Sequence, residues 1–174
     1  TITEPVIPPA CITLKADLAA TKSGLAESDE QKLDTARIQQ ALDHCPSGHA
    51  VVLASEGADN AFLTGPIALR EAVTLVLDKG VTLYASRDPK QYETSSGSCG
   101  IVSKQRGGCK PLIAVDNVSG AGIMGKGVID GRGGAKLLGQ NITWWDLAER
   151  ARTPGLGGPQ VPRVILSSHA DIVT

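Results

Sequence analysis

From Ala50 onward, the chain is a succession of short runs rich in Val, Ile and Leu, separated by turns built on Gly, Asp, Asn or Ser. Most runs follow one another without room for a helix, as in a protein made mainly of strands. Leu53 and Leu75 lie 22 positions apart, and Leu63 and Leu83 lie 20 apart. Such steps are typical of solenoids, in which each circuit of the chain stacks on the last. We predict strands over residues 11–14, 51–53, 62–69, 73–77, 81–84, 112–115, 122–124, 128–129, 164–166 and 172–174.

One segment, residues 29–45, has the pattern of an amphipathic helix. Ile38, Ala41 and Leu42 share one apolar face, Ser28 or Asp29 can cap the start, and a Pro and a Gly follow the end. A sandwich of two sheets would also contain many short strands. However, a helix at the start of a strand stack has a natural role in covering the open end of the core. We therefore predict an all-β fold, a parallel β-helix whose first end this helix caps.

Two long stretches interrupt the rhythm of strands. Residues 85–110 are polar and contain Asp88-Pro89, whereas residues 134–162 contain Trp144-Trp145, a short predicted helix and a loop rich in Gly and Pro. Excursions of this length on a rigid scaffold often line a binding groove. They can equally serve only to cover an apolar flank, and the residues leave both interpretations open.

Composition narrows the class of protein. Hydrophobic residues make up 41% of the 174 residues but aromatic residues only 3%, so the core rests on aliphatic side chains. The net charge of −1, with acids and bases interspersed, argues against nucleic-acid and membrane partners. No apolar run approaches the length of about 20 residues that a transmembrane helix needs. The start at Thr1, without a signal-like segment, fits a processed secreted protein or a trimmed chain.

The cysteine residues support secretion. None of the four lies in a CxxC pair, which argues against a zinc site. We predict one disulfide between Cys99 and Cys109, which bracket a polar loop, and a second between Cys11 and Cys45, which would tie the first strand to the end of the helix. The alternative is four free thiols in a cytosolic protein.

Two motifs that often carry chemistry do not do so here. Residues 120–125 match the GxGxxG pattern of dinucleotide-binding proteins, but a strand and a turn follow where that site requires a helix. His44, His49 and His169 are scattered, and no nucleophile lies in a recognisable turn near them. We therefore predict no cofactor, no metal site and no hydrolase triad.

Acidic residues offer one further candidate pair. Asp116 and Asp130 each stand where a strand meets a turn, a position at which Asp commonly bonds its own backbone. We expect this structural role for both. Asn117-Val118-Ser119 and Asn141-Ile142-Thr143 have the form of glycosylation sequons, which matter only in a eukaryotic secretory host.

Several motifs in fixed order resemble the N-terminal part of the polygalacturonase family of glycoside hydrolases, which degrade pectin. The resemblance runs from the predicted helix to the end of the chain. The matching segments are Arg37-Ile38-Gln39-Gln40-Ala41-Leu42-Asp43, Phe62-Leu63-Thr64-Gly65-Pro66-Ile67, Leu77-Asp78-Lys79-Gly80-Val81-Thr82-Leu83, Asp88-Pro89, Gly125-Lys126-Gly127-Val128-Ile129-Asp130-Gly131-Arg132-Gly133 and Trp144-Trp145.

The resemblance implies a right-handed parallel β-helix and the inverting hydrolysis of polygalacturonate by clustered aspartates, with a basic subsite for the substrate carboxylate. The family's signatures are an Asn-Thr-Asp, an Asp-Asp pair, a Gly-His-Gly and an Arg-x-Lys. None occurs here, and His169 lies in Ser-His-Ala. The prediction is therefore that no catalytic residue lies in this chain.

We expect residues 1–174 to be the N-terminal portion of one β-helix domain of a secreted enzyme, with the helix at about 29–45, the first coils at about 50–174, and the C-terminal remainder of the protein as its partner. Alone, the chain is expected to be inactive and to aggregate. The alternatives are a hydrolase of rhamnogalacturonan or xylogalacturonan, and a non-catalytic β-helical carbohydrate-binding or adhesin module.

Overall fold

Three parallel sheets carry most of the strands. A computed structural model of the chain describes residues 3–170 and 172–173; Thr1, Asp171 and Thr174, on which parts of the predictions rest, lie outside these ranges. The first sheet has the order β1 (Ala10–Lys15), β2 (His49–Ala54), β5 (Val73–Leu77), β9 (Ala121–Gly125) and β13 (Ile172–Val173); the second has β3 (Ala61–Thr64), β6 (Thr82–Ala85) and β10 (Val128–Asp130); the third has β4 (Ile67–Ala68), β8 (Ile113–Asp116) and β12 (Ile165–Ser168).

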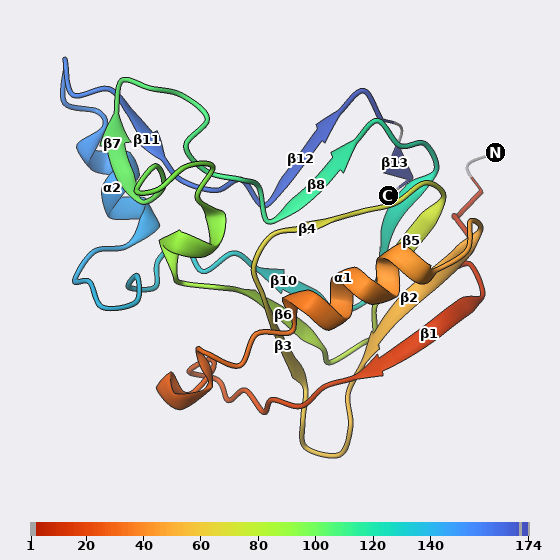
Figure 1. The fold of residues 1–174 in the computed structure, drawn as a ribbon. Helices are drawn as coiled ribbons and strands as arrows, with labels where there is room; N and C mark the ends of the chain where they lie inside the picture. The colour runs from red at the N-terminus through yellow and green to blue at the C-terminus, as the bar shows by residue number, and fades with distance from the viewer. Residues whose placement is uncertain (1–2, 171, 174) are drawn as a thin grey trace.

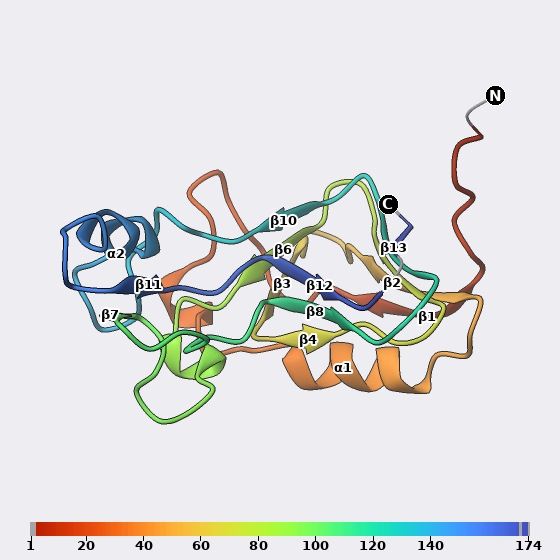
Figure 2. The same ribbon diagram turned by 90° about the horizontal axis from the view of Figure 1, so that it is seen from above.

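The chain visits the three sheets in the same order on each circuit. The first coil consists of β2, β3 and β4, the second of β5, β6 and β8, and the third of β9, β10 and β12, after which β13 returns to the first sheet. Figure 2 shows β4, β8 and β12 lying side by side in that order, with β4 nearest to the helix drawn below it. The predicted strand over residues 62–69 is two strands, because the chain bends at Gly65 and Pro66 to pass from the second sheet to the third.

Apolar side chains at matching positions of successive coils form continuous rows. The register also corrects the predicted repeat, since Leu53 pairs with Leu77 rather than Leu75, and Leu83 pairs with Phe62 rather than Leu63. A single period fails because the turns between the sheets differ in length. Three of the rows are Val51, Leu75 and Ile123 in the first sheet, Phe62, Leu83 and Ile129 in the second, and Ile67, Ile113 and Ile165 in the third.

Helix α1 (Thr35–His44) covers the end of the stack that begins with the first coil, as the sequence predicts (Figures 1 and 2). Its face residues Ile38, Ala41 and Leu42 are buried, with exposed fractions of 0%, 8% and 0%. The predicted start at residue 29 is wrong, because Glu27–Asp29 forms only a short 3₁₀ turn, η1. The segment between the two does not continue as helix, since Asp34 pairs its backbone N–H with the Leu63 carbonyl at 2.6 Å.

Side chains of the helix, and that of Asp34 just before it, also satisfy the backbone edge of the first coil. The Leu63 N–H donates to Asp34 Oδ2 at 2.8 Å, and the Gly65 N–H donates to Thr35 Oγ1 at 2.8 Å. Gln39 pairs with both backbone groups of Ala68, accepting at 2.8 Å and donating at 3.0 Å. Strand edges without partners promote pairing with other chains, so these contacts close this end of the stack.

Both predicted disulfides form. Cys11 is bonded to Cys45, which joins β1 to the end of α1, and Cys99 is bonded to Cys109. In the part of the chain that the structure describes, no helix has the length and apolar character needed to cross a membrane.

The two excursions leave the stack at the same corner, between the second and third sheets, and pack together as one lobe (Figure 1). We define the lobe as residues 86–112 and 131–164. Strands β7 and β11 pair antiparallel across the two excursions, a contact that no pattern in the sequence predicts. The rings of Tyr92 and Trp144 meet edge to face at 5.9 Å. The lobe elements are η2 (Pro89–Tyr92), β7 (Ile101–Ser103), α2 (Trp144–Arg150) and β11 (Gly158–Gln160).

Candidate functional site

An open pocket of about 360 Å³ lies where the end of β10 meets the lobe and the segment before η1. We call it the Arg132 pocket. Tyr84 reaches it from β6, Asp130 from β10 and Trp145 from α2. The full lining is Lys22, Ser23, Gly24, Tyr84, Asp130, Arg132, Gly133, Gly134, Ala135 and Trp145.

Local sequence chemistry shapes the turn that forms one wall of this pocket. Asp130 Oδ1 accepts a hydrogen bond of 2.8 Å from the Arg132 N–H, so Asp130 has the structural role predicted for it. Arg132 adopts a left-handed backbone conformation, with φ of 55°. This tight turn directs the Arg132 side chain toward Glu30 of the segment that precedes α1.

A buried charge network holds the pocket in shape. Glu30 is only 3% exposed, and both Nη atoms of Arg132 donate to its carboxylate, one of them at 2.8 Å. Arg87 Nε lies 3.3 Å from the same carboxylate, and its Nη2 donates to Glu27 at 2.6 Å. The Arg132 guanidinium also lies over the Tyr84 ring, 5.4 Å from its centroid. Because a buried carboxylate requires compensation, these arginine charges serve the fold and are not free for a ligand.

The pair Trp144-Trp145 divides into one buried and one exposed indole. Trp144 is 6% exposed and packs inside the lobe, whereas Trp145 is 70% exposed at the rim of the Arg132 pocket. A capping box between Thr143 and Asp146 fixes the start of α2, and therefore the direction of both rings. The Trp145 ring rests against the backbone of residues 133–134, where an added Cβ would collide with it, so a larger residue at either position would displace the ring.

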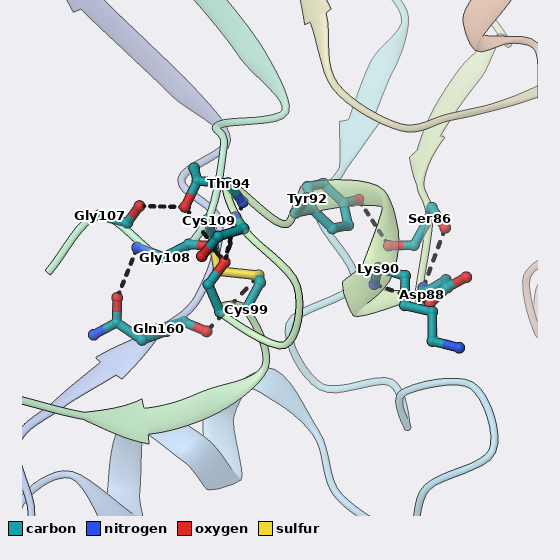
Figure 3. Close-up of a disulfide and its surroundings, with 12 residues drawn as sticks. Ser86, Asp88, Lys90, Tyr92, Thr94, Cys99, Gly107, Gly108, Cys109 and Gln160 are labelled. Carbon is teal, nitrogen blue, oxygen red and sulfur yellow. Dashed lines mark hydrogen bonds between the residues drawn. A yellow bond between two sulfur atoms is a disulfide. The ribbon is translucent and has the colours of Figure 1, made fainter. Parts of the chain in front are cut away.

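Within the lobe, hydrogen bonds join the two excursions around the Cys99–Cys109 disulfide (Figure 3). The Gly108 N–H donates to Gln160 Oε1 at 3.0 Å, and Ser98 Oγ donates to the Gly108 carbonyl at 2.6 Å. The bond to Gln160 attaches the loop of the first excursion to β11 of the second, whereas the bond from Ser98 closes the loop of the first excursion on itself. The lobe is therefore a braced unit.

Tyr92 ties η2 to the residue that follows β6. The phenol of this side chain, which is 1% exposed, donates to the Ser86 carbonyl at 2.7 Å, as Figure 3 shows. Burial raises the pKa of Tyr92, so the phenol stays neutral and remains a donor over the ordinary pH range.

The structure does not assemble the other candidate residues into a site. Asp116 ends β8 in the third sheet and Asp130 ends β10 in the second, so they stand at different corners of the coil. His44 lies at the end of α1, His49 begins β2, and His169 follows β12. Among the described residues, no group of three or more His, Cys, Asp or Glu side chains could hold a metal ion.

Comparisons with known proteins give a consistent family. No protein-family model matches the chain. An endo-polygalacturonase of Pectobacterium parmentieri is 40% identical over 165 residues, 95% of this chain and 37% of the relative. A polygalacturonase of Ralstonia solanacearum is 38% identical over 99% of the chain and 35% of the relative. A solved polygalacturonase from Erwinia carotovora ssp. carotovora superposes with a TM-score of 0.85 at 38% identity, covering 98% of this chain and 42% of that one.

The strand stack and these matches place the chain among relatives of glycoside hydrolases. More narrowly, it is homologous to the polygalacturonases along nearly all of its length, which confirms the resemblance found in the motifs. The chain spans a little more than a third of the length of the curated relatives it matches.

Proposed function

We propose that this chain is the N-terminal section of a secreted polygalacturonase that hydrolyses α-1,4-galacturonan with inversion, and that the catalytic aspartates lie in coils beyond it. The observation that carries the proposal is the 38% identity and TM-score of 0.85 over 98% of the chain with a solved polygalacturonase. The two disulfides support an oxidising, extracellular location.

We also infer that the domain is a right-handed parallel β-helix, of which residues 1–174 form the first part. The repeated order of the three sheets, their parallel pairing in register and the helical cap support this architecture. Solenoid coils bury their apolar faces only against neighbouring coils. The third coil exposes Ile165, at 44%, in a row whose members in the first two coils are buried, which supports further coils of the same protein as its partner.

The lobe is proposed to line the substrate groove, the first of the two roles that the sequence left open for the excursions. Its strands and helix stand at the corner from which β8 and β12 enter the third sheet. Register places Ala68, Ala114 and Leu166 side by side across that sheet, which gives a row with two small side chains beside the lobe. A braced wall next to a flat row of strands suits an extended polysaccharide.

The chemistry requires more than this chain. Inverting hydrolysis needs an acid and a base about 6.5–9.5 Å apart on opposite faces of one sugar. Asp130 is engaged in its own turn, and Asp116 stands at another corner. We therefore expect residues 1–174 alone to show no hydrolysis, and to aggregate through the exposed apolar end.

The test is the release of reducing sugar from polygalacturonate, rhamnogalacturonan and xylogalacturonan by the complete protein and by residues 1–174. We expect the complete protein to cut polygalacturonate, releasing the inverted anomer in NMR spectra, and the shorter chain to be inactive. Preference for either other polymer would support the corresponding alternative hydrolase. A complete protein that binds these polymers without cutting any of them would support the binding or adhesin module. Hydrolysis by residues 1–174 that Asp130→Asn abolishes would place the chemistry in this chain.

A further inference from the structure

The Arg132 pocket has the composition of a saccharide subsite. We propose that it binds one acidic sugar unit, stacked on Trp145, with the sugar's carboxylate paired to Lys22 and a sugar hydroxyl donating to Asp130. The choice of a uronate as the acidic sugar rests on the proposed function. The volume of about 360 Å³ lies at the lower end of the range for small-ligand pockets, about 300–1,000 Å³.

Trp145 supplies an apolar surface that is already in place. Its indole is 70% exposed, yet it rests on the backbone of residues 133–134 and belongs to a helix whose start is fixed by the capping box of Thr143. An exposed aromatic ring normally keeps apolar surface in contact with water, without a compensating contact to other residues. A ring held in this way loses little conformational entropy when a flat ligand covers it, which favours binding.

Two polar groups at the pocket remain available for a ligand. Asp130 uses Oδ1 for the Arg132 N–H, and no intramolecular hydrogen bond to its second carboxylate oxygen is present within the described residues. Lys22 lines the pocket, and across residues 3–170 its ammonium group forms no ion pair. Arg132, by contrast, is committed to Glu30 and the Tyr84 ring. The cation that meets an acidic ligand is therefore Lys22, whereas Arg132 forms the wall.

The arrangement is selective for an acidic sugar over a neutral one. A pocket that offers one aromatic face, one carboxylate acceptor and one ammonium donor satisfies a ring that carries C–H bonds, hydroxyls and a carboxylate. A neutral sugar would stack on Trp145 but would leave Lys22 without its partner. Because Lys22 is exposed, its contribution is modest and depends on ionic strength.

The experiment titrates trigalacturonate into the monomeric fraction of residues 1–174, isolated by size-exclusion chromatography and kept dilute because the exposed apolar end favours aggregation. Binding is read by tryptophan fluorescence and by calorimetry. We expect Trp145→Ala to weaken binding by about tenfold or more, as loss of a preorganised aromatic contact implies. Lys22→Gln should weaken it about two- to fivefold at low salt, and less as salt rises. Far-UV circular dichroism should show both variants folded, because both side chains are exposed. Matched controls are Leu156→Ala, an exposed apolar residue of the lobe, and Lys126→Gln, an exposed lysine outside the pocket.

Fully methyl-esterified trigalacturonate tests the acidic part of the proposal. It should bind more weakly than the free acid, and Lys22→Gln should leave its affinity unchanged. Equal affinity of the two ligands, or unchanged trigalacturonate binding by Trp145→Ala, would overturn the proposal. Failure here is separable from failure of the proposed function. Hydrolysis of polygalacturonate by the complete protein with no trigalacturonate binding to residues 1–174 overturns the subsite alone, whereas binding without hydrolysis overturns the enzyme alone.

Discussion

The first and the third coil of the strand stack differ in what covers their outer edges. At the first coil, α1 buries its apolar face, and Asp34, Thr35 and Gln39 occupy the backbone groups of the strand edge. At the third coil, the edge strand β12 leaves the apolar side chain of Ile165 exposed, although its row faces the core in the first two coils.

Equivalent positions show what this difference means. Ile67, Ile113 and Ile165 form one row across the third sheet, and their exposed fractions are 2%, 0% and 44%. The three residues have the same type and the same register. Only the presence of a neighbour above them differs. In this architecture, the burial of a residue is thus a property of the adjacent coil as much as of its own.

The largest effect is expected from truncating this row. Ile113→Ala should destabilise the chain by about 2–5 kcal/mol, because it removes a fully buried side chain and leaves a cavity. Ile165→Ala at the open end should cost less than about 1 kcal/mol, since that side chain already contacts water. Urea unfolding of the two variants measures both values.

The same pair in the complete protein sharpens the comparison. If further coils cover the third coil, Ile165→Ala should become about as costly there as Ile113→Ala. A similar cost for both variants in residues 1–174 would show that the third coil is not an open end.

Removal of the disulfides comes next. A disulfide that closes a longer loop restricts the unfolded chain more. Cys11 and Cys45 are 34 residues apart, so replacing both with Ser should reduce stability by about 4 kcal/mol. Cys99 and Cys109 are only 10 residues apart, so replacing both should reduce it by about 3 kcal/mol. Thermal unfolding of the two double variants tests the order. A larger loss for the pair in the lobe would mean that native packing, rather than the unfolded state, governs these bridges.

Loss of a helix contact to the strand edge should have an intermediate effect. Gln39→Ala leaves the N–H and carbonyl of Ala68 without their side-chain partner, which should cost about 1–3 kcal/mol. Gln40→Ala, at the neighbouring exposed position, is the matched control and should be nearly neutral. Equal urea midpoints for the two variants would contradict the role assigned to Gln39.

The smallest effect concerns Asp43, at the outer side of the same helix. Hydrogen bonds from Gln39 and Arg70 lower its pKa below the ordinary value of 3.8. Its contribution to stability is therefore present above that value and lost as the pH falls through the lower pKa of the folded state. Asp43→Asn should cost about 0.5 kcal/mol at neutral pH, as for exposed ion pairs, and nothing in strong acid. Unfolding curves of the unchanged chain and of Asp43→Asn across this pH range test the direction of this effect. A larger cost of the substitution in acid than at neutral pH would contradict it.

The sequence predicts the local elements well, because each depends on patterns within a few residues. Residues on the apolar face of α1 are spaced for one side of a helix, and they are buried. The strand runs and both disulfide pairs are also present. The expected structural role of Asp130 holds as well, since its bond to Arg132 spans only two residues.

The errors arise where distant segments compete with local preference. The helix begins at Thr35 because Glu30 and Asp34 make contacts with Arg132 and the edge of β3 instead of continuing the helix. Strands β7 and β11 are separated by more than fifty residues, so their pairing cannot be predicted from a local sequence pattern. The Arg132 pocket was not predicted, because its lining also comes from segments far apart in the sequence. The exposed Trp145, which packs on Gly133 and Gly134, is the feature that could have indicated it.

By itself, the sequence therefore determined the order of strands, the cap, the disulfides and the resemblance to polygalacturonases, since these depend on spacing and on motifs along the chain. Only the tertiary structure decided the register of the coils, the union of two excursions into one lobe and the burial of Glu30 between two arginines. The physical reason is that stacking energy is shared between coils. A residue's neighbours above and below come from segments whose separation is set by the length of the loops between them.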